Sequence, residues 1–327
     1  MALLVGMDEA GYGPHLGPLV VAAAALEFAG DAAPSASLWA LLRQTVRRRP
    51  AGSSDRVVIC DSKRAYSTAN REAGLATLER TVLGFLAAWG LRPRTLADLL
   101  AMVAVGTPDA APEPWHRPAD LALPWQAPAE AVAGAARLLE RGLGAAGAAA
   151  GRLAANVVPA ARLNRLIADG GRNKAQALFA VTLELLADLR RFRPDADLLI
   201  TMDQHGGRHH YADLLAGAFP MQAVETVEES ADGSRYRLGP PPGGRGTMHL
   251  AVRQRAEERS LLAALASMAA KYLRELHMHQ MNAFFQARVP NLKATAGYGR
   301  DARRFLEETR AARAAADLPL EILLRAL

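Results

Sequence analysis

The sequence has 327 residues, of which 50% are hydrophobic and 22% charged, a composition that excludes a disordered or fibrous protein. Its 39 lysines and arginines exceed its 33 aspartates and glutamates, and the formal net charge of +6 favours a polyanionic partner. The single cysteine, Cys60, excludes an internal disulfide and a cysteine-based zinc site, and it fits a reducing compartment.

The hydropathy pattern shows neither a signal peptide nor an apolar run of the length needed to cross a bilayer. We therefore expect a cytoplasmic protein that has no membrane partner. At this length the chain can bury a sizeable core, either as one large domain or as one domain with an insertion.

The first motif lies at the start of the chain, where a short apolar run from Ala2 to Met7 predicts a buried strand. The run leads into two adjacent carboxylates, Asp8 and Glu9, and then into a loop rich in glycine and proline. Because consecutive strand residues point to opposite faces, both carboxylates can serve one site only if the strand ends between them. Neighbouring carboxylates repel each other unless a cation neutralises them, so the pair suits a divalent metal ion better than an acidic surface turn.

This opening resembles that of the type 2 ribonucleases H, the family of ribonucleases HII and HIII. The resemblance rests on Gly6-Met7-Asp8-Glu9-Ala10-Gly11, followed by Gly13-Pro14 and Gly17-Pro18-Leu19-Val20-Val21. It implies that the loop residues Gly11, Tyr12 and Gly13 bind the substrate. Relatives carry arginine or lysine at the position of Tyr12, so this loop lacks the cation that would lie beside a phosphate.

After the loop, the pattern predicts a buried strand from Leu19 to Phe28, a helix over 37–49 and another strand from Arg56 to Ile59. The next residues, Asp61-Ser62-Lys63, are similar to the second motif of the same family, which implies that all three bind the substrate. A hydroxyl and a cation at a strand end can contact a phosphate, whereas an Asx turn before the next helix is the structural alternative. The two interpretations are compatible.

The pattern becomes irregular between about 101 and 160, a region rich in proline and alanine that we interpret as an insertion in the family pattern. Its second half, 129–155, is predicted to be helical because alanine is a strong helix former. The insertion could serve as a lid, a partner-binding surface or a spacer. Its tryptophans, Trp115 and Trp125, could stack on bases or pack beneath the loop.

Regular structure returns with an amphipathic helix that is predicted to begin at Asn173, its N-cap, and to run to about Arg191. Helical spacing places four apolar residues on one side of it: Leu178, Val181, Leu185 and Leu189. A buried strand over 197–202 follows and leads into Asp203 and then into glycines. By resemblance, Asp203 matches the third catalytic aspartate of the family.

Three histidines follow this aspartate closely: His205, His209 and His210. Histidines beside a carboxylate could hint at a transition-metal site. Because they lie in a loop rich in glycine and arginine, we interpret them instead as an exposed, basic rim.

Short strands are predicted at 221–228, 234–238 and 247–253, and a long helix follows. Its start resembles a further family motif, in which Glu257 falls on the fourth metal-binding carboxylate. The structural alternative is that the helix dipole favours a negative charge in the first turn. Glu275 is a weaker candidate, because roughly 27 Å of helix separates it from Glu257. Near the end, Gly297-Tyr298-Gly299 matches the glycine–tyrosine motif of the family, so Tyr298 is expected to stack on a sugar or base.

Taken in order, these motifs imply the ribonuclease H-like α/β fold, with a mixed central sheet flanked by helices and C-terminal helices over about 255–327. They imply a single catalytic domain over 1–327, in which Asp8, Glu9, Asp203 and Glu257 hold two Mg²⁺ or Mn²⁺ ions. The implied activity is metal-dependent endonucleolytic hydrolysis of the RNA strand of RNA–DNA hybrids, or cleavage at ribonucleotides embedded in DNA. We expect the protein to act as a monomer.

Two other functions stay open. The first is a nuclease of the same fold with a different nucleic-acid substrate, because Tyr12 alters the loop that would sense the substrate. The second is a nucleic-acid-binding protein that has lost catalysis, although the retention of all four carboxylates argues against it.

Overall fold

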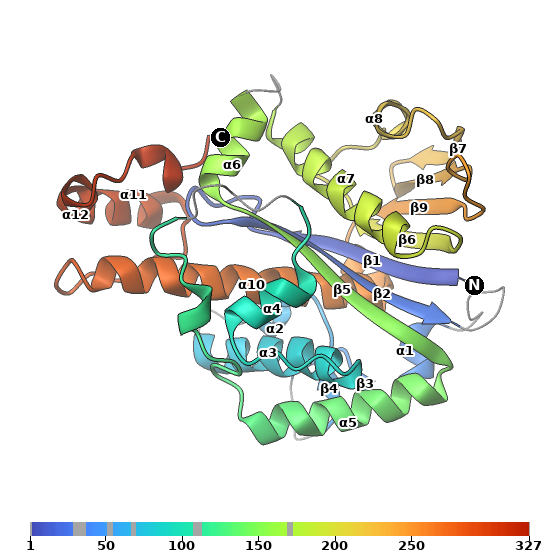
Figure 1. Cartoon of the computed structure of the whole chain (residues 1–327), viewed down its shortest axis with the longest axis horizontal. Helices are drawn as coiled ribbons and strands as arrows, with labels where there is room; N and C mark the ends of the chain where they lie inside the picture. The colour runs from blue at the N-terminus through green and yellow to red at the C-terminus, as the bar shows by residue number, and fades with distance from the viewer. Residues whose placement is uncertain are drawn as a thin grey trace.

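A mixed β-sheet forms the centre of the molecule, with helices on both of its faces (Figure 1). The structure, a computed structural model, describes residues 2–28, 37–50, 55–66, 70–106, 113–168 and 173–326. Within these ranges the sheet has seven strands in the order β5 (Ala148–Val158), β2 (Leu19–Phe28), β1 (Ala2–Ala10), β6 (Asp197–Asp203), β9 (Met248–Arg253), β8 (Gly233–Leu238) and β7 (Val224–Ser230). The predicted fold class, a mixed sheet flanked by helices, is confirmed.

Strand β1 is the centre of the topology, since it pairs antiparallel with β2 and parallel with β6. Helices α10 (Leu261–Gln286) and α3 (Arg71–Ala88) lie on one face of the sheet, and α7 (Lys174–Phe192) lies on the other (Figure 1). The other helices of the described residues are α1 (Leu38–Leu41), α2 (Ser62–Ala65), α4 (Leu96–Val103), α5 (Ala129–Ala145), α6 (Ala160–Ala168), α8 (Ala212–Ala218), α9 (Ala256–Arg259), α11 (Gly299–Glu308) and α12 (Arg310–Ala315), with 3-10 turns at Pro118–Asp120 and Leu320–Ile322. None of the described helices combines the length and the apolar character that crossing a membrane requires.

The two faces of β2 alternate as a strand requires. Val20 and Ala22 pack towards α10 and α3, whereas Val21 and Ala23 pack towards α7. The antiparallel register pairs Asp8 with Ala22 and Glu9 with Val21. The two carboxylates of the opening motif therefore leave the strand on opposite faces of the sheet.

Helix α7 agrees with its prediction in both its start and its buried side. The Asn173 side chain accepts a hydrogen bond from the Gln176 amide at 2.9 Å, and the Gln176 side chain accepts one from the Asn173 amide at 2.9 Å. This reciprocal capping satisfies two amides that the first turn would otherwise leave without partners. The predicted apolar side is buried: Leu178, Val181, Leu185 and Leu189.

Two segments differ from the sequence expectation. The helix expected over 37–49 ends after one turn, at Leu41, and Val46–Arg47 (β3) pairs in parallel with Val57–Val58 (β4) in a separate small sheet. The helix expected over 129–155 ends at Ala145, and 148–158 forms the edge strand β5 on β2. Gly147, with a φ of +78°, stops the helix, and the pairing with β2 then outweighs the helical preference of alanine. The end of the proline- and alanine-rich region is thus part of the central sheet.

The C-terminal helical extension packs against the far half of α10. Leu16, Phe285 and Phe305 share one buried cluster there. The tail after α12 returns to the glycine loop, where Leu324 bridges to Leu16 and the Arg325 amide donates to the His15 carbonyl at 3.0 Å. The end of the described chain therefore supports the loop that follows β1.

The packing of α10 on β1 depends on Gly6, because an added β-carbon there would overlap the backbone of Leu262 and Ala263. We expect Gly6→Ala to lower the free energy of unfolding by about 3 kcal/mol, as overpacking of a close contact does. Gly134→Ala in α5 is the matched control, because nothing lies within 4 Å of a β-carbon there. In urea denaturation the control should be neutral or slightly stabilising; equal stabilities of the two variants would contradict the inferred contact.

Candidate active site

Two of the predicted site carboxylates lie at the carboxyl ends of neighbouring parallel strands. The register of β1 and β6 pairs Met7 with Met202, so Asp8 and Asp203 occupy the next positions along the two strands. Asp203 accepts a hydrogen bond from the Ala256 amide at 3.0 Å, which ties the end of β6 to the short helix α9. Helix α9 carries Glu257 in its first turn, so the same end of the sheet receives a further carboxylate.

All four predicted carboxylates perturb one another electrostatically. Burial, followed by the charge of Glu9, raises the pKa of Asp8 well above its usual value. Burial and the charge of Asp203 raise the pKa of Glu9 to about 7. Burial also raises the pKa values of Asp203 and Glu257, and the charge of Asp203 contributes to the rise at Glu257. These interactions link the four carboxylates into one electrostatic cluster at this end of the sheet.

The four carboxylates do not form a finished metal site. Strand β1 continues through Ala10, so the strand end that we expected between Asp8 and Glu9 is not found. The charges of Glu9 and Asp203 nevertheless raise the pKa of Asp8, and those of Asp203 and Glu257 raise the pKa of Glu9, so both side chains belong to the cluster. Among the described residues, no three histidine, cysteine, aspartate or glutamate side chains come together as a preformed metal-binding group. Glu9 Oε2 is nevertheless buried without a hydrogen-bond partner, which is an unusual state for a carboxylate oxygen.

The second motif lies directly beside this cluster. Asp61 caps α2 by accepting a hydrogen bond from the Lys63 amide at 3.0 Å, so the Asx-turn interpretation of the sequence holds. Lys63 is exposed, and its charge lowers the pKa values of both Glu9 and Asp203. The ammonium group of Lys63 is therefore placed to face an anion that approaches the carboxylates.

Ser267 of α10 links the second motif to the first, and the sequence analysis did not single it out. Its hydroxyl lies 3.0 Å from Ser62 Oγ, and its hydrogen bond to Asp8 favours the ionised form of that carboxyl. The sequence does carry a signal for it: Ala266-Ser267-Met268-Ala269-Ala270-Lys271 resembles an Ala-Ser motif that the type 2 ribonucleases H carry in this helix.

Two buried arginines, Arg274 and Arg325, contact the backbone of the glycine loop (residues 11–17) and support it. The sequence analysis did not identify either of them. Gly11 has a φ of +87°, and an added β-carbon would lie 2.7 Å from Nε of Arg274. Arg325 donates to the carbonyls of Gly11 and Gly17, the latter at 2.7 Å. Burial and the nearby charge of Arg274 lower the pKa of Arg325 to about 9. No local sequence pattern marks an arginine so near the end of the chain as a support for this loop.

Tyr12 lies near Glu9 of the site and near two cations from other elements, Lys174 and Arg208. Burial and the charge of Glu9 raise the pKa of Tyr12, whereas the charge of Arg208 lowers it. Lys174 Nζ lies 4.8 Å from the centre of the Tyr12 ring, which is within cation–π range. The positive charge that the loop lacks at Tyr12 is therefore present nearby, on the first residue of α7.

Tyr298 lies beside the same loop. It is 51% exposed, and a β-carbon at Gly13 would lie 3.8 Å from its Cε1 atom. The guanidinium carbon of Arg274 lies 5.8 Å from its ring centre. An exposed aromatic ring next to the glycine loop is compatible with stacking on a sugar or base.

Other residues that the sequence raised as candidates have structural roles. His205 is 3% exposed and packs against Phe179 and Tyr211, so the prediction of an exposed histidine rim is wrong at this position. Burial lowers the pKa of His205 to about 4, so it is neutral. Glu275 of α10 accepts hydrogen bonds from the Tyr66 hydroxyl and from Lys271, one turn earlier on the same helix, and it is not part of the carboxylate cluster.

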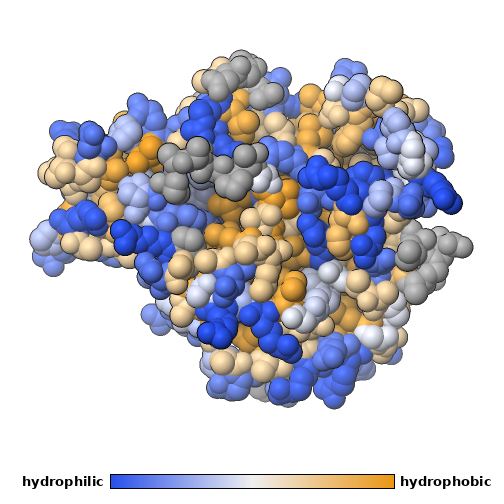
Figure 2. Space-filling model, in the orientation of Figure 1, coloured by the Kyte–Doolittle hydropathy of each residue, from blue (hydrophilic) through white to orange (hydrophobic). Residues whose placement is uncertain are grey.

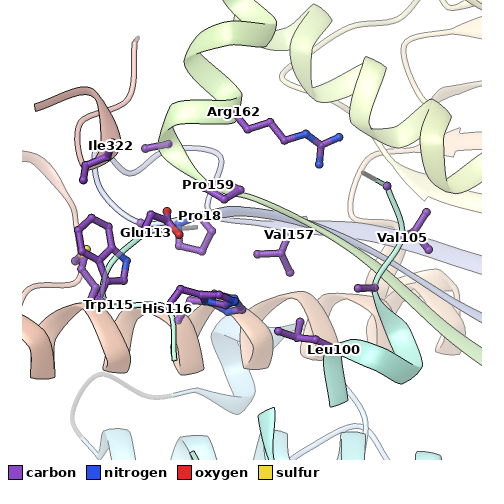
Figure 3. Close-up of a pocket in the computed structure, with 16 residues that line it drawn as sticks. Pro18, Leu100, Val105, Glu113, Trp115, His116, Val157, Pro159, Arg162 and Ile322 are labelled. Carbon is purple, nitrogen blue, oxygen red and sulfur yellow. The ribbon is translucent and has the colours of Figure 1, made fainter. Parts of the chain in front are cut away.

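A separate cavity of about 360 Å³ lies between α4, α10 and the start of α6 (Figure 3). Its lining is mainly apolar, with Leu100, Trp115 and Val157 beside the stacked rings of His116 and His277. Figure 2 shows apolar surface gathered at the centre of this face of the molecule, with hydrophilic surface around it. None of the four carboxylates lines this cavity, so it is separate from the candidate site.

The solved structures that resemble this chain are type 2 ribonucleases H, the family that the motifs resemble. One is a chain from the structure of the PCNA:RNase HII complex of Archaeoglobus fulgidus. The match covers 99% of the present chain and 93% of the chain in that structure, with 15% identity and a TM-score of 0.41. Ribonuclease H2 of Pyrococcus horikoshii matches 98% of this chain and 92% of that chain, with 13% identity and a TM-score of 0.42. Bst-RNase HIII in complex with Mn²⁺ matches 99% of this chain and 66% of that chain, with 15% identity and a TM-score of 0.40.

No protein-family model matches the sequence, and no curated protein matches it. At identities and TM-scores as low as those of the solved structures, the likeness carries no inference about activity. The functional interpretation therefore depends on the residues of the site.

The raised pKa of Glu9 predicts a pH dependence of stability in the absence of divalent ions. Between the ordinary value of 4.5 and the value of about 7 in the fold, the folded protein holds a proton that the unfolded chain has released. The unfolded state then binds fewer protons, so stability falls as the pH rises through this window. Urea denaturation in the presence of a chelator should show this fall, and Glu9→Gln should reduce it. If Glu9→Gln leaves the slope of unfolding free energy against pH unchanged, Glu9 is not the group that holds the proton. Glu140→Gln, at an exposed position of α5, is the control that should leave this slope unchanged.

Proposed function

We propose that this protein is a metal-dependent endonuclease, acting as a single domain, that cleaves the RNA strand of RNA–DNA hybrids or cleaves DNA at embedded ribonucleotides. The observation that carries the proposal is the electrostatic coupling of Asp8, Glu9, Asp203 and Glu257 at one end of the sheet, beside Lys63. The motif resemblance supplies the substrate class. The net charge of +6 agrees with a polyanionic substrate.

The residues of the cluster fit a hard divalent cation such as Mg²⁺ or Mn²⁺. Their donor atoms are carboxylate oxygens, which these ions prefer. Glu9 Oε2 is buried without a partner, and burial together with the charges of neighbouring carboxylates raises the pKa values of Asp8 and Glu9. Asp8, Glu9, Asp203 and Glu257 would hold the ions. When bound, such ions acidify water and neutralise the charge that develops on the leaving oxygen of a phosphodiester.

The other residues of the site would position the substrate. Lys63 faces the carboxylates and can pair with a phosphate that lies between them. The amides and carbonyls of the glycine loop, which Arg274 and Arg325 hold in place, can approach a ribose 2′-hydroxyl closely. Tyr298 offers its exposed ring to the adjacent sugar or base. Ser267 orients Asp8 and favours its ionised form.

A second candidate, a nuclease of this fold with a different nucleic-acid substrate, is favoured by Tyr12. Its ring occupies the place of a cation in the loop, and the nearby cations come from Lys174 and Arg208 instead. A changed arrangement of charge around the loop would change the phosphate position that the site prefers.

We expect Asp8→Asn and Asp203→Asn to abolish cleavage while leaving hybrid binding and the fold intact. Each change removes a negative charge from the proposed metal site with almost no change in side-chain volume. The measurement is Mg²⁺- or Mn²⁺-dependent cleavage of an RNA–DNA hybrid, of a duplex with one embedded ribonucleotide and of an all-DNA duplex. Asp232→Asn, at an exposed turn, is the control that should retain full activity.

The three substrates separate the candidate functions. Cleavage confined to the ribonucleotide-containing substrates supports the first proposal, and equal cleavage of the all-DNA duplex supports the second. Hybrid binding without cleavage under any divalent ion would show a protein of this fold that has lost catalysis. Undiminished turnover in Asp203→Asn would remove that residue from the site.

We further expect Lys174 to supply the phosphate contact that the loop lacks at Tyr12. Lys174→Gln should weaken binding of the hybrid and should reduce the slope of log affinity against log salt by about one. Adding Tyr12→Arg to Lys174→Gln should restore that slope, because it returns a cation to the loop. If Lys174→Gln leaves both affinity and salt slope unchanged, Lys174 does not contact the substrate.

A further inference from the structure

A groove of about 840 Å³ lies beside the candidate active site, where α10 faces α2 and the start of α3. Two residues of the site, Lys63 and Tyr298, belong to its lining, so the groove is continuous with the site. Trp125, from the proline-rich region, and His279 of α10 also line it. The region that we interpreted as an insertion therefore contributes to a surface next to the catalytic carboxylates.

The charges of the groove favour a polyanion. Lys63, Arg64 and Arg71 line it with exposed side chains, and none of the three forms an ion pair within the ranges that the structure describes. The acidic residues of the lining are Glu72 and Glu275, and Glu275 is neutralised by Lys271 at 2.5 Å. Arg64 and Arg71, together with Lys63 at the boundary with the carboxylate cluster, suit the phosphates of a strand that continues from the site.

Trp125 adds a flat aromatic surface to these cations. Its ring centre lies 4.0 Å from that of His279, with an angle of 41° between the ring planes. Burial lowers the pKa of His279, so this pair is uncharged near neutral pH. Trp125 remains partly exposed while it packs against the core on its inner side. The pair thus presents an apolar platform within a cationic groove, a combination that serves to bind bases and phosphates together.

The backbone of this platform is fixed before any ligand binds. Glu79 of α3 is fully buried and accepts hydrogen bonds from the amides of Trp125 at 2.6 Å, Gln126 at 2.6 Å and Ala127 at 2.7 Å. The Tyr272 hydroxyl of α10 donates to the same carboxylate at 2.6 Å. A buried carboxylate with four donors holds the loop rigidly, so little conformational entropy is lost when the indole contacts a ligand.

We propose that this groove binds unpaired nucleotides that continue from the strand at the active site, with a base stacked on Trp125. The proposal deepens the proposed function and rests on it for the neighbouring site. A base offers its face to an indole only where it is unpaired or at a strand end, because bases within a duplex are stacked on both sides. The protein should therefore prefer a hybrid with a single-stranded extension over a blunt hybrid.

The test compares the binding of a blunt hybrid, of hybrids that carry a short unpaired extension of DNA or of RNA, and of the isolated extension strand. Fluorescence anisotropy in the presence of a chelator measures binding without cleavage. The unmodified protein should bind an extended hybrid about 10-fold more tightly than the blunt one, and Trp125→Ala should remove most of that ratio. Trp125→Phe, which keeps a stacking ring, should retain part of it.

Trp39→Ala is the matched control, because Trp39 is a partly exposed tryptophan outside the groove, stacked by Arg48 at 4.3 Å. It should leave the ratio unchanged, and thermal unfolding should show that Trp125→Ala is folded. Arg71→Gln gives an independent readout, since it should weaken binding of the extended hybrid and lower its salt slope by about one without touching the platform.

Equal affinity for blunt and extended hybrids, or an equal loss for both in Trp125→Ala, would overturn the proposal. The two levels of inference fail separately. Extension-dependent binding without cleavage of any substrate would reject the nuclease function and leave the groove in place. Cleavage without a preference for the extension would reject the groove and leave the nuclease function in place.

Discussion

The close contact of α10 with β1 is the interaction on which the rest of this structure depends. Gly6 allows the helix backbone to approach the strand directly, and the small side chains of β2 extend that contact. One rigid helix then carries Ser267 to Asp8, Arg274 to the glycine loop and Tyr272 to the buried Glu79. The carboxylate cluster, the loop above it and the groove beside it are thus positioned by successive turns of α10, and a shift of this helix would displace all three.

The carboxylate cluster is electrostatically unfavourable for the fold. Four acidic groups lie at one end of the sheet, burial raises the pKa of each, and repulsion by a neighbouring carboxylate adds to the rise at Asp8, Glu9 and Glu257. A fold selected for stability alone would pair these groups with arginine or lysine. Among the residues that the structure describes, Lys63 is the cation whose charge lowers the pKa values of two of them, Glu9 and Asp203. Unbalanced negative charge of this kind is expected where a cation binds during function.

The positive charge around the glycine loop, like the carboxylates, comes from elements far apart in the sequence. Lys174 begins α7, Arg274 lies within α10 and Arg325 lies in the C-terminal tail, yet all three surround the glycine loop. Arg325 Nη2 is buried without a hydrogen-bond partner in the described residues. The loop therefore has positive charge around it although Tyr12 carries none.

The sequence by itself determined the elements whose apolar period is unambiguous. The run before Asp8, the run before Asp203 and the apolar side of α7 all form as predicted, because burial of a periodic apolar face dominates local structure. It could not show that the alanine-rich segment changes from helix α5 to strand β5, since alanine favours a helix throughout and only pairing with β2 overrides that preference. Nor could it show that β1 continues past Glu9, that His205 is buried, or that Glu79 holds the Trp125 loop. Those outcomes depend on contacts between residues distant in the chain, which only the packing of the helices on the sheet brings together.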